Sequence, residues 1–561
     1  MTGTLRLRGG RTVDPAHGVD ELRDLGVRDG RIVALHPQEG VDEEVDATGC
    51  VVMAGGIDLH SHIGGGKMNL ARMALPEDHR ADADGDAEGA PPNRRLLPSC
   101  GRCTPGTLAT GYRYAEMGYT SVFEPAMAAS NARQAHMEMG DVPIVDHGAY
   151  VMLGNDELFL RLLSEGAGPQ ALRDYVGWVV QATRALGVKV VNPAGISAFK
   201  FNQRKLDVDE PHAHWGVTPG QVVRALSRAV HELGLAHPLH IHASNLGMAG
   251  NIESTLATID ALDGVPGHLT HVQFHSYGAE GPMKFSSAAL RLAEAVNRHP
   301  NVSIDIGQIL FGQTVTASAD TMRQHAIAGL GSPRKWIGAD IECDAGCGIV
   351  PFRYREQSYV NALQWSIGLE LFLLVNDPWR VVLTTDHPNG APFTSYPHLI
   401  RLLMDKPFRD EQLARLHPAV ASSSPLREMT RELTLSEVAI MTRAAPARLL
   451  GLKDRGHLGV GAAADIAVYR EQGDAEAMFS RPAWVFKDGV PVVRDGEVVA
   501  TPAGGVHFAE PVFDAGVERL IEARTARPFG LHPRHAAIGL DELCGCCGGR
   551  LLPSACLART L

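Results

Sequence analysis

Two histidines close to the start of the chain, His60 and His62, could bind a metal ion together. Alternate side chains of a β-strand point to the same side, so both imidazoles of a His-x-His pair can reach one ion. Histidines in this spacing are more often ordinary surface or core residues than ligands. Here the pair follows the apolar segment VVMAGG and ends the motif GIDLHSH, and this position after a strand favours a metal site.

Further candidate ligands follow or end apolar segments later in the chain: Lys189, His240 and His242, His271 and His275, and Asp386. Lys189, in GVKVVNP, either extends to solvent from a strand end or is carboxylated by CO2, in which case its carbamate could bridge two metal ions. Each histidine pair leaves two choices. On its own segment, His271 is preferred to His275 because it lies nearer the middle of the apolar run.

These residue types favour metal-dependent hydrolysis. Neutral imidazoles and oxygen donors are the ligands that zinc-class ions prefer. Two such ions that share a water would lower its pKa to about 7 and supply hydroxide at neutral pH. Asp386, which follows RVVLTT, could take a proton from this nucleophile as it attacks a carbonyl and pass it to the departing amine. The carbonyl oxygen would bind the exposed metal, which takes the role of an oxyanion hole.

The elements that must position these residues alternate between apolar strands and helical segments. Strand-like runs such as HPLHIHASN, NVSIDIGQI and RVVLTTDHP are separated by helix-like stretches. This alternation predicts an α/β fold with a parallel (β/α)8 TIM-type barrel. In such barrels the reactive groups gather at the C-terminal ends of the strands, where we expect all of the candidate ligands to lie.

Both ends of the chain show a different sequence pattern, in which short strand-like segments are separated by Gly/Asp turns. We expect them to meet in one small β-sandwich made of residues 1–54 and 455–506. Residues 55–454 are then the metal-dependent barrel. Residues 507–561 are expected to form a C-terminal extension with a Cys-rich tail.

The composition excludes several classes of protein. Of the 561 residues, 45% are hydrophobic and 21% charged, as in globular proteins. The net charge of −12 argues against a nucleic-acid partner, and no apolar run approaches the length of a membrane span. The N-terminal segment lacks the apolar core of a secretory signal, so we expect a cytoplasmic protein.

Nine cysteines are few for this length and fit a reducing compartment. They include three clusters: Cys100 and Cys103; Cys343 and Cys347; and the tail residues Cys544, Cys546, Cys547 and Cys556. The tail could bind zinc, but no histidines stand at ligand spacing, so unliganded thiols are expected. A thiol of Cys343 or Cys347 could line an access tunnel, although filling of space is the simpler interpretation.

The ordered motifs resemble the amidohydrolase superfamily. GxDxHxH after the first β-segment, the strand lysine, the later histidines and the final aspartate match its pattern, and MTRAAPARLLGLKDRGHLGVGAAADIAVY is similar to its closing segment. The chain departs at Ala445, where the family often has asparagine before the proline. IDLHSHIGGGKMNLARMALPEDHR, HIHASNLGMAGN and TTDHPNGAPFTSYP further resemble the A component of formylmethanofuran dehydrogenases, which also occurs in bacterial formyltransferase/hydrolase complexes.

The resemblance implies hydrolysis of N-formylmethanofuran to formate and methanofuran in one-carbon metabolism, within a complex of several subunits. It also implies two Zn²⁺ ions bridged by N6-carboxylated Lys189, with a ligand set carried over by position: His60, His62, Lys189, His242, His271 and Asp386. His242 is preferred to His240 because a short polar run follows it, as in related cyclic amidases. Asp386 would also act as the catalytic proton carrier.

Two groups of neighbouring residues are weaker candidates. Four side chains beside the ligands either contact substrate or cap loops: Asn192, Asn245, Gln273 and His387. Four basic residues near the expected mouth could meet an acidic methanofuran tail: Lys67, Arg72, Arg80 and Lys200.

Alternatives to this function stay open. The chain could be another amidase on the same scaffold, such as a dihydropyrimidinase or dihydroorotase, or a non-catalytic assembly subunit. It could also be the amidase subunit of a true tungsten or molybdenum dehydrogenase. The sequence has no Walker loop, no dinucleotide-binding GxGxxG and no four-cysteine cluster motif, so electrons would come from partner chains. Arginine outnumbers lysine, and Ala and Gly are abundant, which favours a GC-rich bacterial genome and hence the bacterial complex.

Overall fold

The fold is described from a computed structural model. It describes residues 3–36, 38–79, 101–281, 283–339, 347–529, 532–546 and 550–559, without the side chains of residues 527–529 and 544–546. Arg80, Cys100, Cys343 and Cys547, which the sequence singled out, lie outside these residues, as do the side chains of Cys544 and Cys546. Within the described ranges, no helix is both long enough and apolar enough to cross a membrane.

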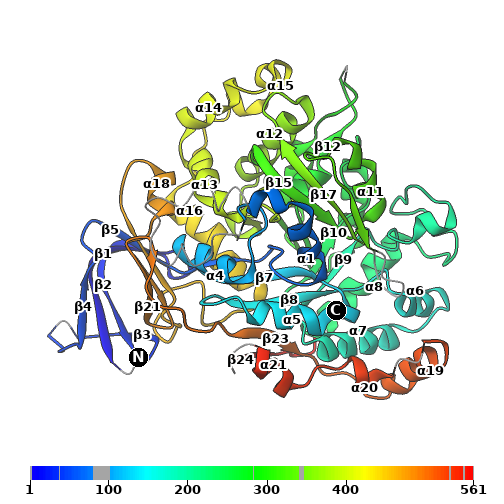
Figure 1. The fold of residues 1–561 in the computed structure, drawn as a ribbon, viewed down its shortest axis with the longest axis horizontal. Helices are drawn as coiled ribbons and strands as arrows, with labels where there is room; N and C mark the ends of the chain where they lie inside the picture. Colours follow the sequence, from blue (N-terminus) through cyan, green and yellow to red (C-terminus); the bar gives the residue numbers. More distant parts are fainter. Residues whose placement is uncertain are drawn as a thin grey trace.

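The centre of the molecule is a curved sheet of eight parallel strands (Figure 1). In spatial order these are β6 (Gly56–Asp58), β7 (Tyr119–Met127), β8 (Asp146–Met152), β9 (Gly187–Val191), β10 (Leu239–His242), β11 (Gly267–Leu269), β14 (Val302–Asp305) and β18 (Val381–Val382). A parallel bridge between Ser61 and His387 joins the segments that follow the first and last strands, and His62 N donates to His387 O at 2.9 Å. The arrangement is consistent with the predicted TIM-type barrel.

Helices connect the strands and pack on the outside of this sheet: α4 (Thr107–Glu116), α5 (Ala132–Gly140), α6 (Glu157–Ser164), α7 (Pro169–Thr183), α8 (Pro219–Glu232), α9 (Ile252–Ala261), α10 (Ala289–Arg298), α12 (Tyr359–Leu374), α13 (Tyr396–Met404) and α17 (Ala445–Leu450). Helix α8 illustrates why they form. Thr218 caps its N-terminus by accepting from Gln221 N, Pro219 stands in its first turn, and its buried face includes Val222 and Leu226. Four further helices lie in the C-terminal half: α14 (Lys406–Ala414), α15 (Pro418–Ser423), α16 (Leu435–Ala439) and α18 (Ala475–Ser480).

The two ends of the chain form one nine-stranded sheet. The N-terminal part supplies β1 (Thr4–Asp14), β2 (Val19–Arg28), β3 (Arg31–Val33), β4 (Glu43–Asp46) and β5 (Cys50–Ala54); the C-terminal part supplies β19 (Ile466–Arg470), β20 (Trp484–Lys487), β21 (Val490–Arg494) and β22 (Glu497–Val498). Strand β5 pairs antiparallel with β19, which joins the two parts, and Figure 1 draws the blue N-terminal strands beside the orange ones. The predicted meeting of the two ends is therefore present; its layering as a sandwich stays a prediction.

An insertion between β14 and α12 forms a separate three-stranded antiparallel sheet. Its elements are β15 (Gly312–Ser318), α11 (Thr321–Ala326), β16 (Ile337–Ala339) and β17 (Cys347–Tyr354). Helix α1 (Gly66–Ala74), which follows the His-x-His motif, packs against β15 and β17. Because strand pairing here joins residues far apart in sequence, the local pattern did not reveal this insertion.

The C-terminal segment extends the barrel sheet. Strand β23 (Val506–Glu510) pairs in parallel with β8, and β24 (Leu551–Ala555) pairs along the whole of β23. Between these two strands the chain forms three helices: α19 (Val517–Phe529), α20 (Pro533–Ala536) and α21 (Leu540–Cys546). The expected boundary between residues 506 and 507 falls inside β23, so this strand belongs to the extension.

Candidate metal centre

A cavity of about 890 Å³ opens at the C-terminal ends of the barrel strands. The barrel wall of this cavity includes His62, Ala126, Lys189, Val191, His242, His271 and Asp386. The facing wall comes largely from the insertion and includes Thr316, Gln324, Leu330, Phe352 and Tyr354. Most of the ligands expected from the sequence thus meet at the place where barrels hold their reactive groups.

The first group of possible ligands is His60, His62 and Asp386, whose ligand atoms lie within 4.8 Å of one another. The Oδ1 atom of Asp386 is 2.9 Å from His60 Nε2 and 3.3 Å from His62 Nε2. Burial alone would raise the pKa of Asp386, but the adjacent His60 and His271 hold it well below its ordinary value. The carboxylate is therefore ionised and can act as a ligand.

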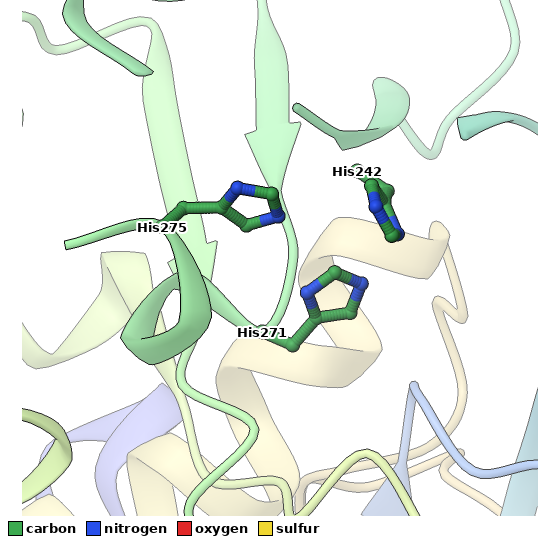
Figure 2. Close-up of side chains that lie close together, drawn as sticks. All are labelled: His242, His271 and His275. Carbon is green, nitrogen blue, oxygen red and sulfur yellow. The ribbon is translucent and has the colours of Figure 1, made fainter. Parts of the chain in front are cut away.

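The second group is His242, His271 and His275, which meet the same distance criterion (Figure 2). His242 ends β10, whereas His271 follows β11 in a left-handed conformation with a φ of 38°. A 3-10 turn, Val272–His275, then brings His275 back toward the same space. The sequence posed His271 and His275 as alternatives, and the structure brings both beside His242.

Lys189 lies on β9 at the cavity wall, next to both groups. Its side chain is 2% exposed, and it has no hydrogen-bond or ion-pair partner among the described residues. Burial, its largest influence, lowers the pKa of this amine to about 8. A larger neutral fraction at neutral pH makes the amine a better nucleophile toward CO2, which suits the carboxylation expected from the sequence.

His240 occupies a different place from His242. It lies deeper in the barrel, where its Nε2 is 2.8 Å from His60 Nδ1 and its Nδ1 is 2.9 Å from His237 Nε2. It is absent from the cavity wall. With His60 and Asp305 it nevertheless forms a third group whose ligand atoms lie within 4.8 Å of one another, so the choice between His240 and His242 stays a prediction. The alternation of side chains along β10 explains the layering, because residues 240 and 242 point inward one layer apart.

Two buried carboxylates that were not predicted from the sequence hold the histidines of the first group. Glu124, on β7, has its Oε1 2.8 Å from His62 Nδ1 and accepts from Ile63 N at 2.8 Å through Oε2. Asp305 ends β14; its Oδ1 accepts from His271 N at 2.9 Å, and its Oδ2 lies 3.4 Å from His60 Nδ1. A carboxylate at the end of an apolar strand was the available signal for Asp305.

The comparisons with known proteins agree with this geometry. A family model described as "Amidohydrolase family" matches residues 43–500, which is most of the chain. The chain belongs to the amidohydrolase family. As a member of this family it is a metal-dependent hydrolase, and its clusters of buried histidines and aspartates fit that chemistry.

Two relatives of this amidohydrolase resemble it over nearly their whole length. The A component of the formyltransferase/hydrolase complex Fhc of Methylorubrum extorquens is 45% identical over 94% of each chain. Protein FwdA of Methanocaldococcus jannaschii is 39% identical over 90% of each chain. A crystal structure of the Methylorubrum extorquens complex with methylofuran contains a chain that superposes with a TM-score of 0.93 at 42% identity, covering 99% of this chain and all of that one.

The four secondary candidates of this amidohydrolase lie outside the wall of the main cavity. Asn192 and Asn245 instead line a smaller cavity, where Asn192 donates to Asp320 and Asn245 donates to Asp207 at 2.6 Å. The ring of His387 packs edge-to-face against Phe393. Gln273 is fully buried beside His271, and neither polar atom of its side chain has a hydrogen-bond partner in the described structure.

The expected basic residues of the mouth are placed unequally. Lys67 lines the cavity. Arg72 does not: its guanidinium donates to Pro105 O and to Ile63 O, because α1 turns it back onto the preceding loop. Lys200 is exposed and also lies away from the cavity wall. Basic side chains that were not predicted from the sequence line it instead, and all come from the insertion or its end: Arg323, Arg353 and Arg355.

The cysteines add no ligand to the centre. Cys50, Cys103, Cys347 and Cys556 are buried and form no disulfide. None of them belongs to a possible metal-binding group within the part of the chain that is described. Cys347 packs with Cys103 in an apolar cluster beneath α1, as expected for a thiol that fills space.

Proposed function

We propose that this chain hydrolyses the formyl amide of a methanofuran-type substrate: N-formylmethanofuran and water give formate and methanofuran. In this proposal it works as the A component of a formyltransferase/hydrolase complex in cytoplasmic one-carbon metabolism. The observation that carries it is the meeting of a histidine, aspartate and lysine donor set at one cavity, in a chain 45% identical to such a component along 94% of its length.

The proposed centre contains two zinc ions held by His60, His62, Lys189, His242, His271 and Asp386, with Lys189 carboxylated on Nζ. The donor set fits zinc, since it consists of imidazoles and carboxylate-type oxygens. When bound, such ions lower the pKa of a water and polarise a carbonyl. A dependence of zinc loading on added bicarbonate would support the carboxylated lysine, and independence would argue against it.

Asp386 is the proposed proton carrier. Its Oδ1 faces His60 and His62, while its Oδ2 accepts from Asn389 Nδ2 at 2.9 Å. Asn389 thereby fixes the carboxylate plane. In this position Asp386 can take a proton from the attacking water and deliver it to the amine nitrogen as the C–N bond breaks. The reaction then leaves formate and a free amine.

The remaining parts of the proposal concern the substrate and the domains. Lys67 and the arginines of the cavity wall would receive an acidic substrate tail, so a substrate without that tail should show a higher KM with a similar kcat. We propose the division into residues 1–54, 55–454, 455–506 and 507–561 as the working domain scheme, with its last boundary moved to the start of β23 at Val506. Substrate contacts by Asn192, Asn245, Gln273 and His387 stay predictions.

The deciding experiment measures zinc content and formate release from N-formylmethanofuran for the wild type and for Asp386→Asn, in the assembled complex. We expect about two zinc ions per chain. We expect the variant to keep most of its zinc, because five ligands remain, and to lose at least about 100-fold in kcat. Unchanged turnover in the variant would contradict the role of Asp386. Wild type without zinc would favour the non-catalytic assembly subunit.

A second candidate function is the amidase step of a true tungsten or molybdenum formylmethanofuran dehydrogenase. It is favoured by the 39% identity to Protein FwdA over 90% of that protein. The same amide chemistry would serve both complexes. Purification of the native complex distinguishes them, because only the dehydrogenase contains tungsten or molybdenum.

A further inference from the structure

We propose that His275 is a third imidazole ligand of the second metal ion, beside His242 and His271. This inference rests on the proposed binuclear centre and extends it. From the sequence, His275 was expected only as a substitute for His271. The geometry instead places three imidazoles around one space.

The distances between the three imidazole rings are the first evidence for a shared metal ion. The ring centroids are 4.7 Å apart for His242 and His271, 5.2 Å for His242 and His275, and 5.4 Å for His271 and His275. One nitrogen of each ring lies within 4.8 Å of one nitrogen of the others. Figure 2 shows the three rings converging on a common space from different elements. Zn–N bonds are about 2.0–2.1 Å, so nitrogens on one ion lie no more than about 4.2 Å apart. From within 4.8 Å of one another, the three rings need to close in only slightly to hold one ion.

Buried ring nitrogens without a hydrogen-bond partner are the second evidence for a shared metal ion. Both ring nitrogens of His275, Nε2 of His242 and Nδ1 of His271 are buried without a hydrogen-bond partner in the described structure. The exposed fraction of His275 is 1%. Buried polar groups are almost always paired, since an unpaired one costs about 1–3 kcal/mol. A metal ion supplies the missing partner for all three rings at once.

The local backbone explains how His275 reaches the site. His271 takes a left-handed conformation, and the 3-10 turn that follows completes about one turn before residue 275. Together, the left-handed residue and the turn bring the side chains of residues 271 and 275 to the same side, with ring centroids 5.4 Å apart. The rings of His271 and His275 accordingly stack at an interplanar angle of 25°. The backbone thus presents both imidazoles to His242.

The consequence is that the two ions sit in unequal sites. The first has two imidazoles and the carboxylate of Asp386; the second has three imidazoles. Lys189 is available to both. Loss of one imidazole should therefore weaken only the second site and leave the first close to its original affinity.

The test is titration of the metal-free full chain with Zn²⁺ and Co²⁺ against a competing chelator. The variants are His275→Ala and His275→Asn. His147→Asn is the control, because His147 is also 1% exposed with both ring nitrogens unpartnered but belongs to no candidate metal group in the described chain. We expect each His275 variant to bind one of two ions at least about 10-fold more weakly and to change the visible Co²⁺ spectrum. The control should match the wild type.

Anomalous scattering at the zinc edge from crystals of the loaded wild type provides a measurement that does not depend on a variant folding. A zinc ion within bonding distance of a His275 nitrogen supports the proposal; zinc bound only by His242 and His271 overturns it. Wild-type affinity and an unchanged Co²⁺ spectrum in both variants would overturn it too. Two tightly bound ions without formate release would refute the proposed function and leave the His275 ligand intact.

Discussion

At the scale of single residues, the candidate metal centre depends on what each histidine binds through the ring nitrogen that faces away from the proposed metal ion. His62 offers Nε2 toward Asp386 because its Nδ1 lies 2.8 Å from Glu124, a buried carboxylate. Burial would raise the pKa of Glu124, but the adjacent His62 outweighs this and lowers the pKa to about 2. An ionised Glu124 keeps the proton on Nδ1 and leaves the Nε2 lone pair for a metal.

Replacing Glu124 by glutamine should weaken metal binding without removing a ligand. An amide cannot hold the His62 proton as firmly as a carboxylate can, so we expect zinc affinity at the first site to fall by about 10- to 100-fold. Chelator competition on the metal-free chain measures this. Glu138→Gln is the matched control, because Glu138 accepts from the nearby Gly65 N at 2.8 Å but touches no proposed ligand. Equal affinities in the two variants would refute the positioning role.

At the scale of elements, the sequence predicted the strands that carry the candidate ligands because their signal is local: an apolar run that contains or precedes a histidine, lysine or aspartate. The apolar runs predicted Lys189 on β9 and left His240 and His242 on β10 as alternatives, between which the family resemblance favoured His242. The turn after β11 and the three-stranded insertion were not predicted from the sequence. The left-handed His271 donates from its backbone N to Asp305 of β14, and the insertion pairs Thr316 with Val350. Contacts between residues this far apart in sequence do not affect the local hydrophobic periodicity, so they could not be predicted from it.

Gly307, two residues after the end of β14, shows how closely these elements pack. Its φ is 63°, and a Cβ added there would lie 2.4 Å from His271 Cβ and 2.7 Å from His271 Cα. We therefore expect Gly307→Ala to displace the His271 turn, to cost about 1–3 kcal/mol of stability, and to reduce zinc at the second site. Urea unfolding and zinc content measure the two effects.

The control for this variant is Gly473→Ala, since no atom lies within 4 Å of a Cβ added at Gly473. It should change neither stability nor zinc content. Full zinc affinity in Gly307→Ala would mean that the His271 turn can shift without consequence, which would contradict the close packing between β11 and β14.

At the scale of the whole molecule, a buried ion cluster joins the three parts of the chain. Lys487, on β20 of the nine-stranded sheet, donates to Asp146 of the barrel strand β8 at 2.9 Å and to Asp465. Arg455 lies 2.8 Å from Asp146. From the C-terminal extension, Arg550 pairs with Asp488. Because charges this deep are costly when unpaired, the cluster fixes how the sheet, barrel and extension sit together.

Removing one charge from this cluster should be strongly destabilising. We expect Lys487→Met to cost about 3–5 kcal/mol in the free energy of unfolding at neutral pH, because it leaves two buried carboxylates with one cation fewer. Lys453→Met, an exposed lysine in the nearby loop, should stay within about 0.5 kcal/mol of the wild type. Chemical unfolding of the full chain measures both.

The pH dependence of this loss follows from the pKa shifts in the cluster. Burial would raise the pKa of Asp146, but Lys487 and Arg455 hold it well below its ordinary value. Its stabilisation is therefore present above about pH 4 and is lost as the pH falls through the lower folded value. The pKa of Lys487 is raised by Asp146 and Asp465 against the effect of burial, so its contribution is lost only as the pH rises through that raised value. The difference between wild type and Lys487→Met should stay constant from about pH 7 to pH 10. It should shrink in acid, where Asp146 and the adjacent His507, whose pKa burial and Lys487 lower, take up protons. A difference that grows in acid would show that another group controls the junction.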